Sequence, residues 1–324
     1  MPVSVLQLLL LSTISLSVLE SPSQKLRTDH DSALRALAED EEKVIQIPSG
    51  PRIVTLDGRI TETVIALGRA DDIVGLDSTS VYPPRIVKDK TEVGYVRMLS
   101  AEGVLSLLPE VIIASGSAGP PQAVEQIKKS GVRWINLDFE DTPAGTRKLI
   151  QKLGSLFQKK PEAAQLITSL DNDLQSAFEI SRSFEKKPRI LFIYARGSRV
   201  LNVAGKKTSA HEIIQLTGAI NAFDEIEGYR PLTAESVIAA APDIILMMEK
   251  GKKSLGGSPG ILRLPGIPLT PAGKMNRIIS MPDMKLLGFG PRLGEAVLDL
   301  TKSIQKVTSS KNKMPTAPPP IRRR

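Results

Sequence analysis

The stretch "PAGTRKLIQKLGSLFQKKPEAAQLITSLDNDLQSAFEISRSF", residues 143–184, decides the fold of this chain. Its apolar residues recur at the spacing of an amphipathic helix, and no part of it alternates as a strand does. Pro161 interrupts it, so either a second helical segment begins there or a single helix is kinked. Strand and helix patterns alternate on both sides of the stretch. It therefore predicts a helical connection, over residues 143–187, between two α/β lobes.

Short strands alternate with short helices before this connection. A helix between two strands places the strands parallel, so this half of the chain predicts a parallel sheet covered by helices. Thr61 is the expected N-cap of the first helix. The expected strands are "RIVTLD" (52–57), "DDIVGLD" (71–77), "EVIIAS" (110–115) and "VRWINLD" (132–138), and the expected helices are "TETVIALG" (61–68), "SAEGVLSLL" (100–108) and "PPQAVEQIKKSG" (120–131).

The alternation resumes after the connection with the strand "KPRILFIYA" (187–195). An internal repeat supports a second lobe, because "LSAEGVLSLLPEVII" (99–113) returns as "LTAESVIAAAPDIIL" (232–246). Any helix followed by proline and a strand has some of this likeness, but the upstream "GYVRML" and "GYRPL" also match. The predicted fold class is α/β, with two Rossmann-like lobes of parallel sheet linked by a long helical segment.

The two ends of the chain differ from the lobes. The apolar run "VSVLQLLLLSTISLSVL" (3–19) suits a secretory signal and is short for a membrane span. No basic residue precedes it, so a misassigned start and a retained anchor stay open. The predicted organisation is a signal peptide (1–21), a polar linker (22–50), a first lobe (51–142), the helical connection (143–187), a second lobe (188–306) and a disordered basic tail (307–324).

Composition narrows the function classes. The chain has no cysteine, which excludes disulfides, thiolate metal sites, a cysteine nucleophile and a lipid-bearing N-terminal cysteine. The formal net charge of +8 suits an anionic partner, but aromatic residues make up only 4% and no nucleic-acid motif is present, so nucleic acid is not expected. Glycine-rich phosphate loops, nucleophile elbows and zinc-protease motifs are also missing from the sequence, so an enzyme is the distant alternative.

The chain resembles the substrate-binding proteins of ABC importers in which a rigid helix links two α/β lobes, and among them the periplasmic haem-binding proteins. The similarity runs from about residue 51 to 305. It is carried by "RIVTLDGRITETVIALG", "DSTSVYPP", "VGYVRMLSAEGVLSLLPEVIIASGSAGPP", "ILFIYARG", "VAGKKTSAHEIIQLTGAINAF", "EGYRPLTAESVIAAAPDIILM", "SLGG" and "LLGFGPRLGEAV". The likeness to haem carriers rests on "VGYVRMLSAEG", "AGPP" and "GFGPRLGEA".

The resemblance implies haem as the transported ligand and Tyr95 as the axial ligand of its iron. A phenolate oxygen is a known haem ligand. Arg97 lies two residues on, so in an extended segment both side chains point to one side, where a guanidinium favours the phenolate. From the residues alone, a loop tyrosine bonded to backbone is the more ordinary interpretation of Tyr95, and a surface pair to Glu92 explains Arg97 equally well.

The second lobe offers weaker candidates. Arg196 occupies the position where some relatives carry a histidine, which argues against histidine-assisted ligation and against two stacked haems. Arg196 and Lys250 are candidate partners of the haem propionates, although a lysine in a charge run is more often solvated. Tyr194 and Tyr229 are candidate cleft residues, with packing as the alternative. His211 follows the N-cap pair Thr208 and Ser209 and is interpreted as a first-turn helix residue.

The resemblance also implies partners and a location. Glu102 and Glu235, matched in the two repeats, would dock on a two-fold permease, whereas the simpler interpretation is that they complement helix dipoles. The expected partners are an ABC permease with its ATPase subunits and an outer-membrane haem receptor system, and the expected state is a periplasmic monomer. Within the same fold, a ferric siderophore or a corrinoid is the alternative ligand.

Overall fold

The structure is a computed structural model that describes residues 46–309. The predicted signal peptide, nearly all of the polar linker and most of the basic tail lie outside the described residues. Among residues 46–309, no helix combines the length and apolar character needed to cross a membrane.

The first lobe is built on a parallel sheet of strand order β3-β2-β1-β4-β5. Its strands are β1 (Ile53–Leu56), β2 (Ile73–Leu76), β3 (Thr91–Glu92), β4 (Val111–Ser115) and β5 (Arg133–Leu137). Its helical elements are α2 (Gly58–Ala66), η1 (Ala70–Asp72), α3 (Pro84–Val87), α4 (Ala101–Leu105) and α5 (Pro121–Lys129). The predicted parallel sheet of this lobe is confirmed.

Side chains that alternate along the strands give this sheet two buried faces. On one face, Ile53 and Ile113 pack with α2 and α6, and on the other, Val54 and Ile112 pack with α4 and α5. Alternate residues of a strand point to opposite faces, so a strand buried on both sides is apolar throughout. All four residues of β1 are accordingly buried.

The second lobe contains a sheet of order β11-β10-β6-β7-β9, with β8 beside β6. Its strands are β6 (Arg189–Arg196), β7 (Val200–Ala204), β8 (Ile220–Asn221), β9 (Tyr229–Pro231), β10 (Ile244–Met248) and β11 (Ile278–Met281). Its helical elements are α8 (Ser209–Leu216), α9 (Ala234–Ala240), α10 (Glu249–Ser254), α11 (Ser258–Ile261), η2 (Ile267–Leu269), α12 (Pro271–Lys274), α13 (Asp283–Leu287) and α14 (Leu293–Ser309).

The second sheet departs from the predicted parallel arrangement. β6, β10 and β11 run parallel, but β7 is antiparallel to both β6 and β9. The reason is the short turn between β6 and β7, in which Gly197 has a positive φ of 63°. A tight turn can join only antiparallel strands, since a parallel crossover needs a dozen or more residues. The two-lobed α/β class is confirmed, and the second sheet is mixed.

The helical connection consists of two helices, α6 (Pro143–Leu156) and α7 (Lys160–Ser181). Gln158, with φ of 58°, ends the first helical path, and Pro161 lies in the first turn of α7, where its missing N–H costs no helical bond. Of the two alternatives that Pro161 left open, a second helical segment is therefore the one that forms. Leu153 of α6 packs in the first-lobe core, whereas Leu170 of α7 packs in the second-lobe core.

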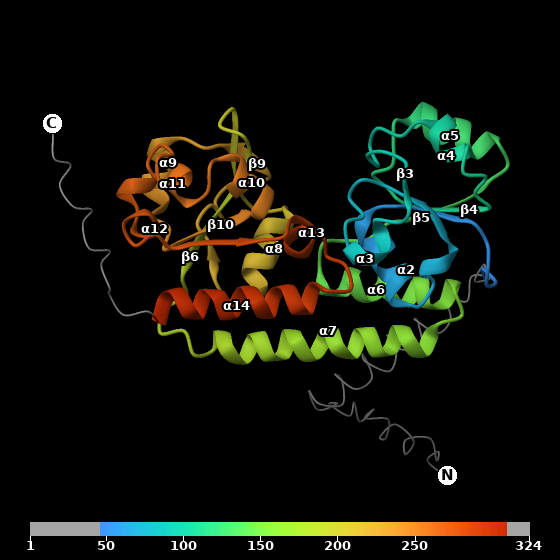
Figure 1. Ribbon diagram of the computed structural model, residues 1–324. Helices are drawn as coiled ribbons and strands as arrows, with labels where there is room; N and C mark the ends of the chain where they lie inside the picture. The colour runs from blue at the N-terminus through green and yellow to red at the C-terminus, as the bar shows by residue number, and fades with distance from the viewer. Residues whose placement is uncertain (1–45, 310–324) are drawn as a thin grey trace, which may run out of the picture. The chain divides into compact units, whose positions relative to one another are not determined.

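Helix α14 lies beside α7 (Figure 1) and fills the second-lobe core with Leu300 and Ile304. Helix α14 continues to Ser309, so the predicted start of the tail at residue 307 is wrong. The reason is that apolar residues of α14 face α7 as far as the last turn of α14. The predicted end of the polar linker at residue 50 is also wrong, because the packed structure already begins before it. Ile47 is buried, and its N–H donates to the carbonyl of Leu156 at 2.8 Å.

The internal repeat is a repeat of structure. Helix α4 leads into β4 as α9 leads into β10, with the N-caps Ser100 and Thr233 each accepting a backbone N–H from three residues on. At the far ends of these helices, Leu108 and Ala241 both have positive φ, 48° and 43°, immediately before a proline. The same local geometry thus occurs once in each lobe.

The predicted N-cap of the first helix is wrong. Helix α2 begins at Gly58, and Asp57 is its cap, accepting the N–H of Arg59 at 3.0 Å. Thr61 lies inside the helix, fully buried, with its hydroxyl 2.7 Å from that of Thr55 and 2.6 Å from that of Ser80. The hydroxyl of Thr61 serves tertiary contacts, which a local capping pattern does not reveal.

Candidate ligand-binding site

A pocket of about 360 Å³ lies at the carboxyl ends of the first-lobe strands. β1 pairs with β2 on one side and β4 on the other, so the direction of chain progression reverses between β1 and β4. Loops that leave such neighbouring strands in opposite directions open a crevice, and α/β proteins bind ligands there. The pocket is lined by Asp57, Arg59, Thr79, Tyr95, Val96, Arg97, Ser115, Gly116, Ser117, Leu137, Asp138, Phe139, Asp141, Met284, Leu287 and Gly288.

Tyr95 and Arg97 reach this pocket from the loop between β3 and α4. Val96, which lies between them, is buried. The N–H of Gly119 donates to the carbonyl of Val96 at 2.9 Å, and this bond holds the loop in place. Gly94 begins the loop with a positive φ of 93°, a backbone conformation that would be strained for a residue with a side chain. The N–H of Met98 donates to the carbonyl of Tyr95 at 2.7 Å, so residues 95–98 form a turn and the extended segment predicted from the sequence is not formed. Tyr95 and Arg97 both line the pocket from this turn, with Val96 buried between them.

Both side chains are available to a ligand. Tyr95 is 39% exposed, and in the part of the chain that the structure describes neither its phenol nor the guanidinium of Arg97 has a hydrogen-bond or ion-pair partner. The surface pair between Arg97 and Glu92, the alternative from the sequence, is therefore not formed. A free phenol and a free guanidinium at one pocket can hold a metal ion and an anionic oxygen.

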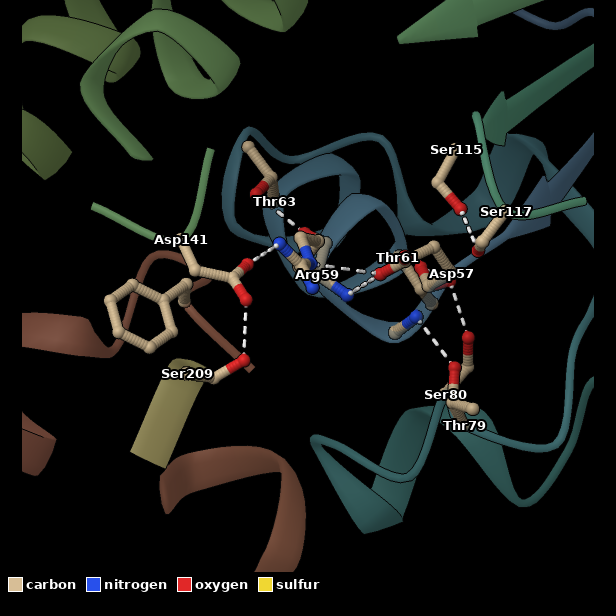
Figure 2. Close-up of polar contacts among 12 residues, drawn as sticks. Asp57, Arg59, Thr61, Thr63, Thr79, Ser80, Ser115, Ser117, Asp141 and Ser209 are labelled. Carbon is tan, nitrogen blue, oxygen red and sulfur yellow. Dashed lines mark hydrogen bonds and ion pairs between the residues drawn. The ribbon is translucent and has the colours of Figure 1, made fainter. Parts of the chain in front are cut away.

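The floor of the pocket is a network of hydroxyls and carboxylates (Figure 2). The N–H of Asp57 donates to Asp77 at 3.1 Å, which holds Asp57 at a φ of 147° that L-residues rarely adopt. Ser80 donates its hydroxyl to Asp77 at 2.9 Å, and Thr79 donates its hydroxyl to the same carboxylate at 2.8 Å. Ser115 and Ser117, after β4, lie 2.8 Å apart across their hydroxyls. The network fixes the loops that bear the site.

Asp77 should make folding stability depend on pH. Burial raises the pKa of this carboxyl above its ordinary 3.8, although hydrogen bonds from Thr79 and Ser80 lower it. The folded state thus binds a proton more tightly than the unfolded state, so stability falls as pH rises from about 3.8 through the raised pKa. Urea unfolding of the protein and of Asp77→Asn across this range should give a shallower fall in the variant. Parallel curves would contradict it.

Arg59 is held between two carboxylates. Its Nη1 donates to Asp141 at 2.8 Å, its Nε lies 3.3 Å from Asp57, and its guanidinium stacks 4.6 Å from the ring centre of Phe139. Asp141 also accepts a hydrogen bond from the hydroxyl of Ser209 in the second lobe (Figure 2). Because its charge is already matched, Arg59 has little left for a ligand anion.

Arg59, Asp138 and Asp141 line the pocket but were not predicted from the sequence. A usable signal was present, since Asp57, Asp138 and Asp141 all follow strands whose carboxyl ends meet at one edge of the sheet. Counted as charges, the pocket lining holds three aspartates and two arginines, and one of those arginines is already paired. The first-lobe wall is therefore acidic except near Arg97.

The second-lobe candidates gather apart from this pocket. The rings of Tyr194 and Tyr229 meet edge to face at 5.9 Å, and the guanidinium of Arg196 lies 5.8 Å from the ring centre of Tyr194. Burial raises the pKa of the Tyr229 phenol, and Tyr194 and Asp141 raise it further, so Tyr229 stays a neutral phenol. The structure brings these three together and does not place them in the pocket wall with Tyr95.

Lys250, a predicted partner of the propionates, lies in α10, and its backbone N–H donates to Asp283 at 3.3 Å. The turn between β6 and β7 touches this helix, because the N–H of Gly197 donates to the Ser254 hydroxyl at 3.1 Å. Cations from both elements therefore share one side of the second lobe. They are Arg196, Arg199, Lys250, Lys252 and Lys253, and within residues 46–309 none of them has an acidic partner.

Glu102 and Glu235 both lie in the first turn of their helices, α4 and α9, and both are exposed. Across the described residues, neither carboxylate is engaged by a cation. His211 is a first-turn residue of α8, as predicted: its N–H donates to Thr208 at 3.1 Å, and its Nδ1 lies 3.2 Å from the side-chain amide of Asn221. The ring of His211 is engaged in this contact within its own lobe.

Comparison with known proteins identifies the family. A model described as a periplasmic binding protein matches residues 53–284. The chain belongs to the periplasmic binding protein family. A curated member, the uncharacterized ABC transporter substrate-binding lipoprotein YvrC of Bacillus subtilis, is 27% identical over 78% of this chain and 79% of its own. The family and this relative are binding proteins of transport systems.

Solved structures in the periplasmic binding protein family match more of the sequence. The periplasmic heme-binding protein RhuT from Roseiflexus sp. RS-1 is 38% identical, with a TM-score of 0.77 over 80% of this chain and 99% of that chain. The heme-binding protein BhuT, solved with two hemes, is 36% identical, with a TM-score of 0.75 over 79% and 98%. A vitamin B12-binding protein of Pectobacterium atrosepticum is 26% identical over 60% of this chain and 71% of its own.

Proposed function

We propose that this binding protein captures haem at the pocket of Tyr95 and Arg97 and delivers it to an ABC importer. The observation that carries the proposal is the shared presentation of a free phenol and a free guanidinium at the carboxyl edge of the first-lobe sheet. The haem-binding proteins among the solved relatives support the choice of ligand.

Tyr95 is the proposed axial ligand of ferric iron. A free phenol has a pKa of about 10, so it must ionise to coordinate. Fe(III) supplies most of that driving force, and the guanidinium of Arg97 favours the anion further by charge and hydrogen bonding. The porphyrin face would bury apolar area against the pocket rim, where Met284 and Leu287 lie.

The haem propionates are proposed to face the second lobe. The acidic first-lobe wall repels carboxylates, and Arg59 is already neutralised by Asp57 and Asp141. The cations around Arg196 and Lys250 have no acidic partner in the described residues, so they are free to attract propionates. Beside these cations, the rings of Tyr194 and Tyr229 are proposed to make apolar contacts with the haem, and their hydroxyls to make polar contacts with it.

The same acidity argues against the alternative of a ferric siderophore. Siderophore complexes are commonly anionic and have no open iron position, so they need arginines and no ligating tyrosine. A corrinoid remains the second candidate, favoured by the vitamin B12-binding relative. A corrinoid contains no ferric iron for Tyr95 to coordinate, so the presence or absence of tyrosinate–iron bands in the visible spectrum distinguishes the two ligands.

We further propose that the chain is exported to the periplasm and acts as a monomer. Glu102 and Glu235 would pair with cations on the two halves of a permease, because matched exposed carboxylates on two lobes suit a two-fold partner. ATPase subunits would complete the importer, and an outer-membrane receptor system would supply haem. The match to a periplasmic binding protein family and to an ABC transporter substrate-binding relative supports a binding protein over the enzyme alternative.

The decisive experiment is a titration of the protein from about residue 22 onward with ferric hemin, followed by its visible spectrum. A saturable spectrum with tyrosinate charge-transfer bands is the expected result. Cyanocobalamin and a ferric hydroxamate siderophore serve as competing ligands in parallel titrations. Saturable binding of either one, without a specific hemin spectrum, would move the ligand and leave the binding-protein fold unchanged.

A further inference from the structure

We propose that Arg292 is a positioning residue: by locking onto Glu62 it fixes the angle between the lobes and holds the second-lobe wall of the pocket in place. Arg292 precedes α14 of the second lobe, and Glu62 lies in α2 of the first. The pocket wall concerned is Met284, Leu287 and Gly288. The part of this inference that concerns ligand release rests on the proposed haem binding.

The contact itself is a bidentate ion pair. Arg292 Nε donates to Glu62 Oε2 at 2.9 Å, and Nη2 donates to Oε1 at 2.7 Å. The Glu62 side chain is only 5% exposed and that of Arg292 17%. The guanidinium also stacks 3.6 Å from the ring centre of Tyr82. A planar cation held by two parallel bonds and one ring has a single geometry, unlike a pair of flexible surface charges.

Neighbouring contacts show that the whole segment from Phe289 to Arg292 is seated against the first lobe. The carbonyl of Phe289 accepts the hydroxyl of Thr146 at 2.9 Å in a buried site. Gly290 packs on α2 so closely that a Cβ there would lie 3.3 Å from the Cβ of Arg59. The contact is tight for a Cβ, so the segment lies directly against α2 with little space between them.

The second-lobe residues that line the pocket come immediately before this segment in the sequence. Leu287 and Gly288 line it from the end of α13, and Met284 reaches toward the start of α2, where a Cβ on Gly58 would come within 2.8 Å of the Met284 Cε. The two halves of the ligand site are on different lobes. The pair of Arg292 and Glu62, outside the pocket, therefore fixes their separation together with the contacts of Thr146 with Phe289 and of Asp141 with Ser209.

The test measures the distance between the lobes directly. The chain has no cysteine, so spin labels at Gln126→Cys on α5 and Ala239→Cys on α9, both exposed, attach at those two sites alone. Double electron–electron resonance should give a narrow distance distribution in the otherwise unchanged protein and a broader one in Arg292→Gln. The charge-free double variant Glu62→Gln with Arg292→Gln should broaden as well, and it leaves no buried charge unpaired to threaten folding.

Lys285→Gln is the matched control. Lys285 pairs with Glu295 and Asp299 inside the second lobe, close in sequence to Arg292 but without a first-lobe partner. This variant should keep the narrow distribution. A distribution equally narrow in the Arg292 variants, or equally broad in Lys285→Gln, overturns the proposal. This readout needs no ligand, so it stands or falls apart from the haem assignment.

The consequence for the ligand is measured with hemin. Arg292→Gln should release hemin roughly tenfold faster, because a second-lobe wall that is no longer held in place loses its contacts with the bound ligand more often, and affinity changes in related complexes lie mostly in the dissociation rate. The tyrosinate bands should persist, since Tyr95 is untouched. An unchanged dissociation rate beside a broadened distance distribution overturns the link to the pocket, whereas a protein that binds no hemin at all refutes the proposed function.

Discussion

Tyr95→Phe should abolish the tyrosinate charge-transfer bands of the hemin complex and weaken hemin binding by roughly a hundredfold or more. The substitution removes one oxygen atom and keeps the ring, so the loss reports coordination. The side chain is 39% exposed and has no hydrogen-bond partner among residues 46–309, so folding stability should change little. The measurement is a hemin titration by visible absorbance, with thermal unfolding in parallel.

Tyr229→Phe is the control for this result. Tyr229 is equally exposed, at 40%, and loses the same oxygen atom, but it lies with Tyr194 on the second lobe. Its variant should retain the bands and bind hemin within a few-fold of the parent. Bands that survive in Tyr95→Phe and vanish in Tyr229→Phe would transfer the iron to the second lobe and refute the assignment of Tyr95.

Reversing the charge of Glu102 and Glu235 together should prevent delivery while leaving capture intact. Like charges brought face to face across an interface cost several kcal/mol, so Glu102→Lys with Glu235→Lys should lower stimulation of importer ATPase by roughly tenfold or more. Each single variant should stimulate the ATPase to a level between that of the parent and that of the double variant, because the two lobes are proposed to contact different halves of the permease. The measurement is ATP hydrolysis by the importer in proteoliposomes against the concentration of hemin-loaded protein.

Glu179→Lys supplies the matched control for the charge change. Glu179 is exposed on α7 and has no place in the repeated α4 and α9 geometry. It should leave both hemin binding and ATPase stimulation unchanged. Equal stimulation by the Glu102 and Glu235 double variant would return these carboxylates to the simpler role of complementing their helix dipoles.

Local patterns in the sequence predicted most of the elements. Alternating apolar strands and capped helices are set by residues within a few positions of one another, so Thr208 capping α8 and the pairing of helix and strand in each repeat were readable. The presence of Tyr95 and Arg97 at one site was also predicted, but the reason given for it was wrong. They were expected on one side of an extended segment, whereas they line the pocket from a turn in which the N–H of Met98 donates to the carbonyl of Tyr95.

Contacts between distant segments could not be predicted in this way. Thr61 looked like a cap and is a buried partner of Thr55 and Ser80. The short turn at Gly197 makes β7 antiparallel to its neighbours in a sheet that the strand–helix pattern had predicted to be parallel. For Thr61, packing against residues elsewhere in the chain decided the outcome, whereas for β7 the short turn at Gly197 decided it.

The sequence by itself determined the order of the lobes and the helical connection, because these depend on neighbouring residues, and its resemblance to haem-binding proteins indicated Tyr95 and Arg97. Only the tertiary structure decided which charges pair between distant segments: Arg59 with Asp141, and Glu62 with Arg292, 230 positions away. Such pairs leave no periodic trace in the sequence, since their energy comes from burial and geometry that exist only after both lobes have formed.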